Sequence, residues 1–312
     1  MRKTFQSPWM GAVLAGLFGL LLLASPAQAQ PFGGPGGGGR RGGGRGGFGG
    51  GRGGRSYGAN GEDPGPSFIY ETNGPQWTND PAFKDDVFTF ARLIYPSPGY
   101  GYNGGGEWWT DTPDADLNLT FRLHQLTSLK VRPGLNYIRI TPDNLAKYPF
   151  VYIVEPGRLQ FTDAQVTALR QYLLNGGFLM VDDFWGSGQW RNLYEQIKRV
   201  LPEYEPVELG LDHPIFHTVF DLKAKPQMPG IEVFMRTGLT WEQNWDYNYE
   251  SHDSHFFGIF DHKDHMMVFI SHNNDFGDGW EREGVSEEYF HRFSEPQAYP
   301  MIINVLFYTM TH

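Results

Sequence analysis

Residues 175–186 read NGGFLMVDDFWG, and this stretch decides the fold class. Its centre, Phe178 to Val181, is short and wholly apolar, as is typical of a strand buried on both faces of a parallel sheet. The two glycines before it end a helix that starts with a capping box at Thr162 to Gln165. Ser187 follows and is placed to cap the next helix. Helix, buried strand and helix in this order predict an α/β sheet with helices on both faces.

The rest of the globular part continues this alternation on both sides of the stretch. Thr112-Pro113 is expected to open a helix, with threonine as the cap and proline as the first helical residue, and Ser294 is expected to cap the last one. Residues 226–255 show no clear period and are interpreted as a long surface insertion. The expected strands are residues 87–95, 136–140, 150–154 and 178–181, and a hairpin of 256–260 with 266–270. Together these elements predict a doubly wound, mostly parallel sheet with one β-hairpin excursion.

The N-terminus has the features of a secretory signal peptide, which we assign to residues 1–29. Arg2 and Lys3 precede an uncharged apolar run from Met10 to Ala24, and Ala27 to Ala29 forms a small-x-small cleavage site. The alternative is an uncleaved membrane anchor, for which the apolar run is short. We therefore expect the protein to be exported, to the periplasm or beyond the cell.

A glycine- and arginine-rich segment at residues 30–63 follows, and its composition predicts a flexible, disordered linker. The remainder, residues 64–312, is expected to form a single domain. No later stretch is apolar enough to cross a bilayer, so we expect no stable membrane insertion after signal cleavage.

Charge and cysteine content exclude several function classes. Seven of the 25 basic residues but only two of the 35 acidic residues precede residue 64, which leaves the domain with 18 basic and 33 acidic residues. Such a domain repels nucleic acid and suits a cation, a neutral sugar or a basic protein surface. The chain has no cysteine, which excludes disulfides, thiolate metal sites and a cysteine nucleophile.

Carboxylates at the end of the buried strand are the first candidates for a functional site. In open α/β sheets, ligands bind beyond the carboxyl ends of the strands, where Asp182 and Asp183 lie. The pair could bind a cation or divide acid and base roles; the alternative is an ordinary turn or helix cap. His213 precedes Pro214 and is held extended, so it could act as a base or simply brace a turn.

The loop after the second hairpin strand, residues 271–281, is rich in oxygen ligands that suit a hard cation. Its spacing does not match an EF-hand, and the alternative is an acidic turn. No cofactor follows from this pattern; a divalent cation is the one candidate it leaves open. The candidate ligand-binding residues are Trp109, Asp111, Trp185, Asn274, Asp275 and Asp278.

Histidines and aromatic residues supply two further, weaker patterns. Five histidines, at positions 252, 255, 262, 265 and 272, invite a zinc interpretation, but two lie in the expected hairpin turn and no HExxH motif is present. Aromatic side chains in the expected loops, such as Trp108, Trp109 and Trp245, could stack on sugars; the alternative is packing under long loops.

A further set of positions lies along nearly the whole globular part: Phe90, Arg92, Leu93, Tyr95, Trp109, Asp111 to Leu117, Leu126-Thr127, Tyr148 to Phe150, Gly176 to Leu179, Asp182 to Gly186, His213 to Phe216, Gly277-Asp278 and Thr311-His312. Together these positions resemble a bacterial family catalogued as domain of unknown function 4159. The resemblance implies a flavodoxin-like fold similar to class I glutamine amidotransferases, in an exported or membrane-associated setting and without an established activity. Amidotransferases of that fold use a cysteine on a strand-to-helix elbow, so this chain cannot perform their reaction.

Three functions remain open on the sequence. The favoured one is a non-catalytic binding or scaffold domain of the cell envelope, with an envelope protein or a glycan as partner. The second is a carboxylate- or metal-dependent hydrolase of an envelope or polysaccharide substrate, using Asp182, Asp183 and His213. The third is a glycan-binding module.

Overall fold

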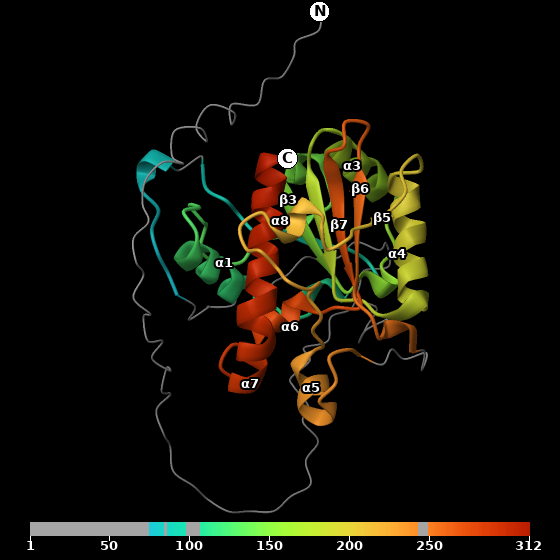
Figure 1. The fold of residues 1–312 in the computed structure, drawn as a ribbon. Helices are drawn as coiled ribbons and strands as arrows, with labels where there is room; N and C mark the ends of the chain where they lie inside the picture. The colour runs from blue at the N-terminus through green and yellow to red at the C-terminus, as the bar shows by residue number, and fades with distance from the viewer. Residues whose placement is uncertain (1–74, 84–85, 98–106, 243–248) are drawn as a thin grey trace, which may run out of the picture. The chain divides into compact units, whose positions relative to one another are not determined.

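The computed structural model describes residues 75–83, 86–97, 107–242 and 249–312 (Figure 1). The expected signal peptide and linker lie outside these residues. Every element named below belongs to the described part of the chain.

The described strands form one sheet in the order β2-β1-β3-β4-β7-β6-β5. Neighbours from β2 to β7 run parallel, whereas β6 is antiparallel to β7 and β5 is antiparallel to β6. The strands are β1 (Arg92–Ile94), β2 (Tyr137–Arg139), β3 (Phe150–Val154), β4 (Phe178–Asp182), β5 (Val207–Glu208), β6 (His255–Phe260) and β7 (Met266–His272). The expected α/β class, the mostly parallel sheet and the hairpin are confirmed.

Helices cover both faces of this sheet. The helices are α1 (Asp114–Leu126), α2 (Pro142–Leu145), α3 (Asp163–Leu174), α4 (Gly186–Val200), α5 (Ile231–Thr237), α6 (Phe276–Glu281), α7 (Glu287–Tyr289) and α8 (Tyr299–Thr311), with a π-helical segment at Phe290–Ala298 between the last two. Figure 1 shows α1 and α8 to one side of the strands and α4 to the other.

Alternating side chains of the central strands divide the core into two layers. Phe150 and Tyr152 of β3 pack in one layer with residues of α1, α6 and α8. Val151 and Ile153 point the other way and pack with residues of α3 and α4. All five residues of β3 and of β4 are buried, as the apolar sequence of these strands predicts.

The sequence predicts capping residues at four helix starts, and the structure confirms only the one at Thr162. Thr162 accepts a hydrogen bond from the Gln165 amide, and Gln165 returns one to the Thr162 amide, so the capping box at α3 is present. Ser187 does not cap α4, which begins at Gly186: its first amide donors meet Gln189 Oε1 and Asn273 Oδ1 instead.

The other two caps also differ from expectation. Thr112 is not the cap of α1, because its hydroxyl donates to the Trp109 carbonyl and the helix begins at Asp114. Ser294 is buried inside a continuous helical run, in which the π-helical segment accommodates Pro296 without ending the helix. Sequence alone identified these helices but placed their starts incorrectly.

Residues 226–255 are more than a surface insertion. Met228, Ile231 and Phe234 are buried in the layer that contains α6 and α8. They bring α5 beyond one end of the strands (Figure 1). None of the helices in the described residues has both the length and the apolar composition that a bilayer span requires.

Candidate functional site

Acidic side chains gather at one edge of the sheet. The parallel strands β1, β3, β4 and β7 end at this edge, so the segments that follow them converge there. We call the group the carboxylate cluster; its members are Asp111, Glu155, Asp182, Asp183, Glu242, Asp275, Asp278 and Glu281.

Four residues at this edge of the sheet share a strained backbone conformation. Asp111, Glu155, Asp183 and Asn273 have φ angles of 63°, 46°, 56° and 58°, in the left-handed region that non-glycine residues rarely adopt. Three of them directly follow the ends of β3, β4 and β7. Of the non-glycine residues with positive φ in the described chain, only Asp264 lies elsewhere, in the hairpin turn. Clustered strain of this kind is typical of functional sites.

Two sets of carboxylates are close enough to share a cation. One oxygen each from Asp111, Asp183 and Asp275 lie within 4.8 Å of one another, and so do oxygens from Asp111, Asp278 and Glu281. Asp111 belongs to both sets. Hard cations such as Ca²⁺ bind carboxylate oxygens at about 2.3–2.6 Å, so oxygens on opposite sides of one ion lie up to about 5 Å apart. The donor set therefore fits a hard divalent cation.

The first of these sets has no basic partner. Among the described residues, no lysine, arginine or histidine forms an ion pair with Asp111, Asp183 or Asp275. The second set differs: Arg282 Nε lies 2.6 Å from Glu281 Oε2 and 3.6 Å from Asp278 Oδ1. The described residues thus contain one carboxylate set with an arginine partner and one set without a basic partner.

Burial and mutual repulsion favour protons on these groups. Burial, followed by the charge of Asp278, raises the pKa of Asp111 to about 8. Burial also raises the pKa of Asp183 and Asp275 well above the aspartate range, with Glu155 the next cause for Asp183 and Asp183 the next for Asp275. The pKa is raised, chiefly by burial, to about 8 for Glu155, 7 for Asp182, 7 for Glu242 and 9 for Glu281. The cluster can therefore hold either protons or a cation near neutral pH.

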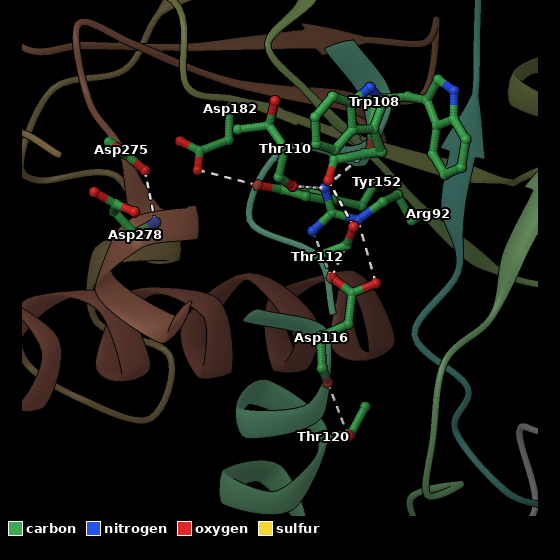
Figure 2. Close-up of polar contacts among 11 residues, drawn as sticks. Arg92, Trp108, Thr110, Thr112, Asp116, Thr120, Tyr152, Asp182, Asp275 and Asp278 are labelled. Carbon is green, nitrogen blue, oxygen red and sulfur yellow. Dashed lines mark hydrogen bonds and ion pairs between the residues drawn. The ribbon is translucent and has the colours of Figure 1, made fainter. Parts of the chain in front are cut away.

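A buried arginine holds the loop that carries Asp111. Arg92 is 0% exposed, and its Nε and Nη2 donate to the Asp116 carboxylate at 2.5–3.2 Å. Its Nη1 donates to the carbonyl oxygens of Trp108, at 3.2 Å, and Thr110, at 2.7 Å. Figure 2 shows the guanidinium between the Asp116 carboxylate and these carbonyls.

Asp182 acts as a link between the sheet and helix α6. Its Oδ2 accepts a hydrogen bond from the Tyr152 hydroxyl at 3.3 Å (Figure 2). It also accepts one from the Phe276 amide at 2.9 Å. The Arg92 guanidinium lies 5.2 Å from the centre of the Tyr152 ring. Asp182 therefore connects the cluster to β3 and α6, whereas Asp183 accepts a hydrogen bond from Trp185 Nε1 at 3.1 Å.

The loop after β7 supplies both ligands and scaffolding. Asp275 caps α6 by accepting from the Asp278 amide at 2.7 Å, and Asp278 Oδ2 accepts from the Ile231 amide at 2.6 Å. Asn274 has a structural role instead. Its Oδ1 accepts a hydrogen bond from the Met228 amide at 2.7 Å and so holds the segment before α5.

Two glycines allow the carboxylates to approach so closely. A Cβ at Gly277 would overlap Asp111 Oδ2, an atom that is buried and has no hydrogen-bond partner. A Cβ at Gly230 would lie 2.7 Å from Glu242 Oε1 and 2.9 Å from Asp278 Oδ2. Because glycine has no Cβ, the backbone at these two positions leaves room for the carboxylate oxygens of the cluster.

Several candidates from the sequence lie apart from the cluster. His213 packs against Phe260 and Tyr308, at the hairpin end of β6. The opposite end of β6, at His255, pairs with His272, the last residue of β7. Six strand residues separate the two ends by roughly 16 Å, so the structure does not bring His213 to Asp182 and Asp183.

The histidines and tryptophans singled out from the sequence do not form a common site in the described residues either. His272 is buried and faces the Gly186 carbonyl, and burial lowers its pKa to about 4; the other four histidines pair separately with Asp253, Glu208, Tyr204 and Asp261. Trp108 is buried, whereas Trp109 is 51% exposed two residues before Asp111. Trp245 lies outside the described residues.

Glu155, Glu242 and Arg92 were not identified as site residues from the sequence. Glu155 follows β3 as Asp183 follows β4, so the rule that selected Asp183 also applies to Glu155. No pattern in the sequence places Glu242 or Arg92 at this edge. Glu242 reaches it through α5, where its Oε1 accepts from the Gly230 amide at 2.6 Å.

Comparison with known proteins identifies a family without an assigned activity. A family model described as "Domain of unknown function (DUF4159)" matches residues 89–310, which include every member of the carboxylate cluster. No curated protein matches the chain.

Proposed function

The chain belongs to the family of domain of unknown function 4159, and on that premise we propose that it is an exported binding domain of the bacterial envelope whose ligand site takes a divalent cation. The cation would be held by Asp111, Asp183 and Asp275. When bound, it supplies a positive centre on which a further ligand is recognised.

One observation carries this proposal: the buried carboxylates of Asp183 and Asp275 and the half-buried one of Asp111, from three separate segments, converge without an ion-pair partner among the described residues. Burying like charges together costs free energy unless they are protonated or bind a cation. Two of these aspartates, Asp111 and Asp183, also have strained backbone conformations, which add to the free-energy cost of the site. Oxygen ligands at this spacing favour hard cations, Ca²⁺ before softer metals.

A non-catalytic role is supported by the chemistry that the chain lacks. Asp183 has a positive φ and lies between β4 and α4, as a nucleophile on a strand-to-helix elbow would. We infer that this position corresponds to the cysteine of class I glutamine amidotransferases, whose fold the family resemblance implies for this chain. Because the sequence contains no cysteine, a ligand site would take the place of that reaction.

A metal-dependent hydrolase is the second candidate, favoured by the shared ligand Asp111. A carboxylate common to two ligand sets is the arrangement that two-cation hydrolases use. Arg282, however, already pairs with Asp278 and Glu281, so a second cation would have to displace it. His213 offers no help, since it lies at the other end of β6.

Thermal unfolding of the purified protein with Ca²⁺, Mg²⁺ or Mn²⁺ tests the proposal. A cation at a hundred times its Kd stabilises by about 2.7 kcal/mol, which raises Tm measurably. We expect this rise in the wild type and in Glu195→Gln, an exposed control on α4, and its loss in Asp183→Asn and Asp275→Asn. A wild-type Tm that no cation changes would contradict the proposal.

A further inference from the structure

Trp109 is exposed to solvent beside the carboxylate cluster. Its side chain is 51% exposed, whereas the other tryptophans of the described residues are buried or half-buried. Only Thr110 separates it from Asp111, so the two Cα atoms are at most about 7 Å apart. The one exposed tryptophan of the described residues is therefore a close neighbour of the carboxylate that both ligand sets share.

The turn that carries Trp109 is held in place on both sides. The Thr112 hydroxyl donates to the Trp109 carbonyl oxygen at 2.6 Å, and the Thr112 amide donates to it at 3.2 Å. Arg92 Nη1 donates to the carbonyl oxygens on either side, those of Trp108 and Thr110. Tryptophan is usually well buried, so one that a fixed turn exposes beside a cation site indicates contact with a ligand, at a low entropic cost of binding.

The proposed cation has coordination positions to spare for a ligand. Asp183 Oδ1 accepts from Trp185, and Asp275 Oδ1 accepts from the Asp278 amide, which favours the other oxygen of each aspartate as the cation ligand. With one oxygen from Asp111 as well, the protein fills three positions. Ca²⁺ takes about six to eight oxygen ligands, so the remaining positions are open to water or to hydroxyl groups of a ligand.

The charge around the site favours a neutral ligand over an anion. Three aspartates exceed the charge of one divalent cation, and Glu155 and Glu242 belong to the same cluster. The chain after residue 63 has 18 basic and 33 acidic residues, so its overall field also repels anions. A sugar meets both demands of the site: its adjacent hydroxyl groups are neutral oxygen ligands, and the C–H face of its ring packs on an aromatic side chain.

We propose that the site binds a neutral sugar, with two adjacent ring hydroxyls on the cation and the face of the ring on Trp109. The proposal rests on the cation site proposed above and names the ligand that this cation recognises. The cation selects for free hydroxyl groups and the indole selects for an apolar ring face, so the loss of either should weaken binding.

Methyl α-mannopyranoside and methyl β-galactopyranoside are suitable probes in calorimetric titrations of the calcium-loaded protein. Both are neutral, and their adjacent ring hydroxyls differ in orientation. Their fully O-methylated derivatives keep the ring but offer no free hydroxyl group to the cation. We expect saturable binding of at least one glycoside, no saturable binding of its methylated derivative, and loss of glycoside binding when EDTA removes the calcium.

Variants at Trp109 complete the test. Trp109→Ser should weaken the preferred glycoside by about tenfold or more, because the ring face is lost, and should leave calcium affinity unchanged. Trp109→Tyr retains an aromatic face and should keep most of the binding. Phe83→Ser is the matched control, since Phe83 is an exposed aromatic residue whose ring faces Lys130, beyond the C-terminal end of α1.

A preceding calcium titration separates the two proposals. If calcium binds and neither glycoside does, the sugar inference fails while the cation site stands. Wild-type glycoside affinity in Trp109→Ser, or equal glycoside binding with and without calcium, would also overturn the sugar inference. If calcium does not bind, the proposed function fails, and the sugar inference fails with it.

Discussion

Arg92 Nη1 donates a 2.7 Å hydrogen bond to the carbonyl oxygen of Thr110, the residue directly before Asp111. Through this bond, a buried ion pair with Asp116 on helix α1 fixes the position of the one carboxylate that both ligand sets share. Asp111 is thus held in place from β1 and α1, whereas Asp183 and Asp275 lie in the segments that follow β4 and β7.

Replacement of Arg92 is expected to unfold the site and weaken the whole domain. Arg92→Met leaves the Asp116 carboxylate buried without a partner, which costs about 3–5 kcal/mol. Denaturant unfolding measures this loss. Arg122→Met is the control, because its pair with Glu283 is partly exposed and should contribute about 1 kcal/mol or less. Equal losses in the two variants would contradict the role assigned to Arg92.

Arg92→Lys separates charge from geometry. Lysine retains the positive charge but cannot bridge Asp116 and the Thr110 carbonyl with a planar fork. We expect calcium affinity to fall more than tenfold while the protein remains folded by circular dichroism. Unchanged affinity would show that the loop holding Asp111 does not depend on the fork.

Gly277→Ala is expected to abolish cation binding because the added Cβ overlaps Asp111 Oδ2. Gly284→Ala is the control. Gly284 has open space around it but a φ of 82°, so an alanine there adds backbone strain of about 1 kcal/mol without contacting the cluster. Calcium titrations of both variants check this. Retained binding in Gly277→Ala would mean that Asp111 is not a ligand.

Stability without divalent cations should fall as pH rises from about 4 to 8. The folded-state pKa of Asp111, about 8, lies above the ordinary aspartate value, so the folded state binds more protons than the unfolded state in this window. The stabilisation that each such group contributes is complete below about pH 4. It then declines as the pH rises, by up to about 1.4 kcal/mol per pH unit for each group. The charges facing Asp111 are Asp278 and Asp182, which raise its pKa, and Arg92 and Arg282, which lower it.

Urea unfolding across this pH range measures the slope. Saturating Ca²⁺ should flatten it, because the cation replaces the protons. A stability that instead rises steadily from pH 4 to 8 would show that the carboxylates are ionised and paired in the folded protein.

The sheet could be predicted from the sequence because its strands are marked by local composition. Phe178 to Val181 is apolar throughout, and burial on both faces leaves such a strand few alternatives. The site edge followed from the same observation, since parallel strands end together. Asp183 and Asp275, chosen from separate stretches, lie within 4.8 Å of each other at a ligand oxygen.

The remaining features depend on contacts between distant segments. Ser187 has the right residue type for a cap, but Asn273, 86 positions later, binds the first amide of α4. Arg92 lies in a strand that composition marks as core, and only α1 shows why a buried arginine is tolerated there. Likewise, Glu242 enters the cluster through the Gly230 amide, a contact without a local signal.

Calorimetric titration of the protein with calcium chloride, in two neutral buffers of different ionisation enthalpy, tests the central claim most directly. The account predicts saturable binding whose heat differs between the buffers, because Ca²⁺ displaces protons from Asp111, Asp183 and Asp275. Asp183→Asn and Asp275→Asn should lose this binding, and Glu195→Gln should keep it. Absence of saturable binding in the wild type, or binding that both aspartate variants retain, would contradict the account.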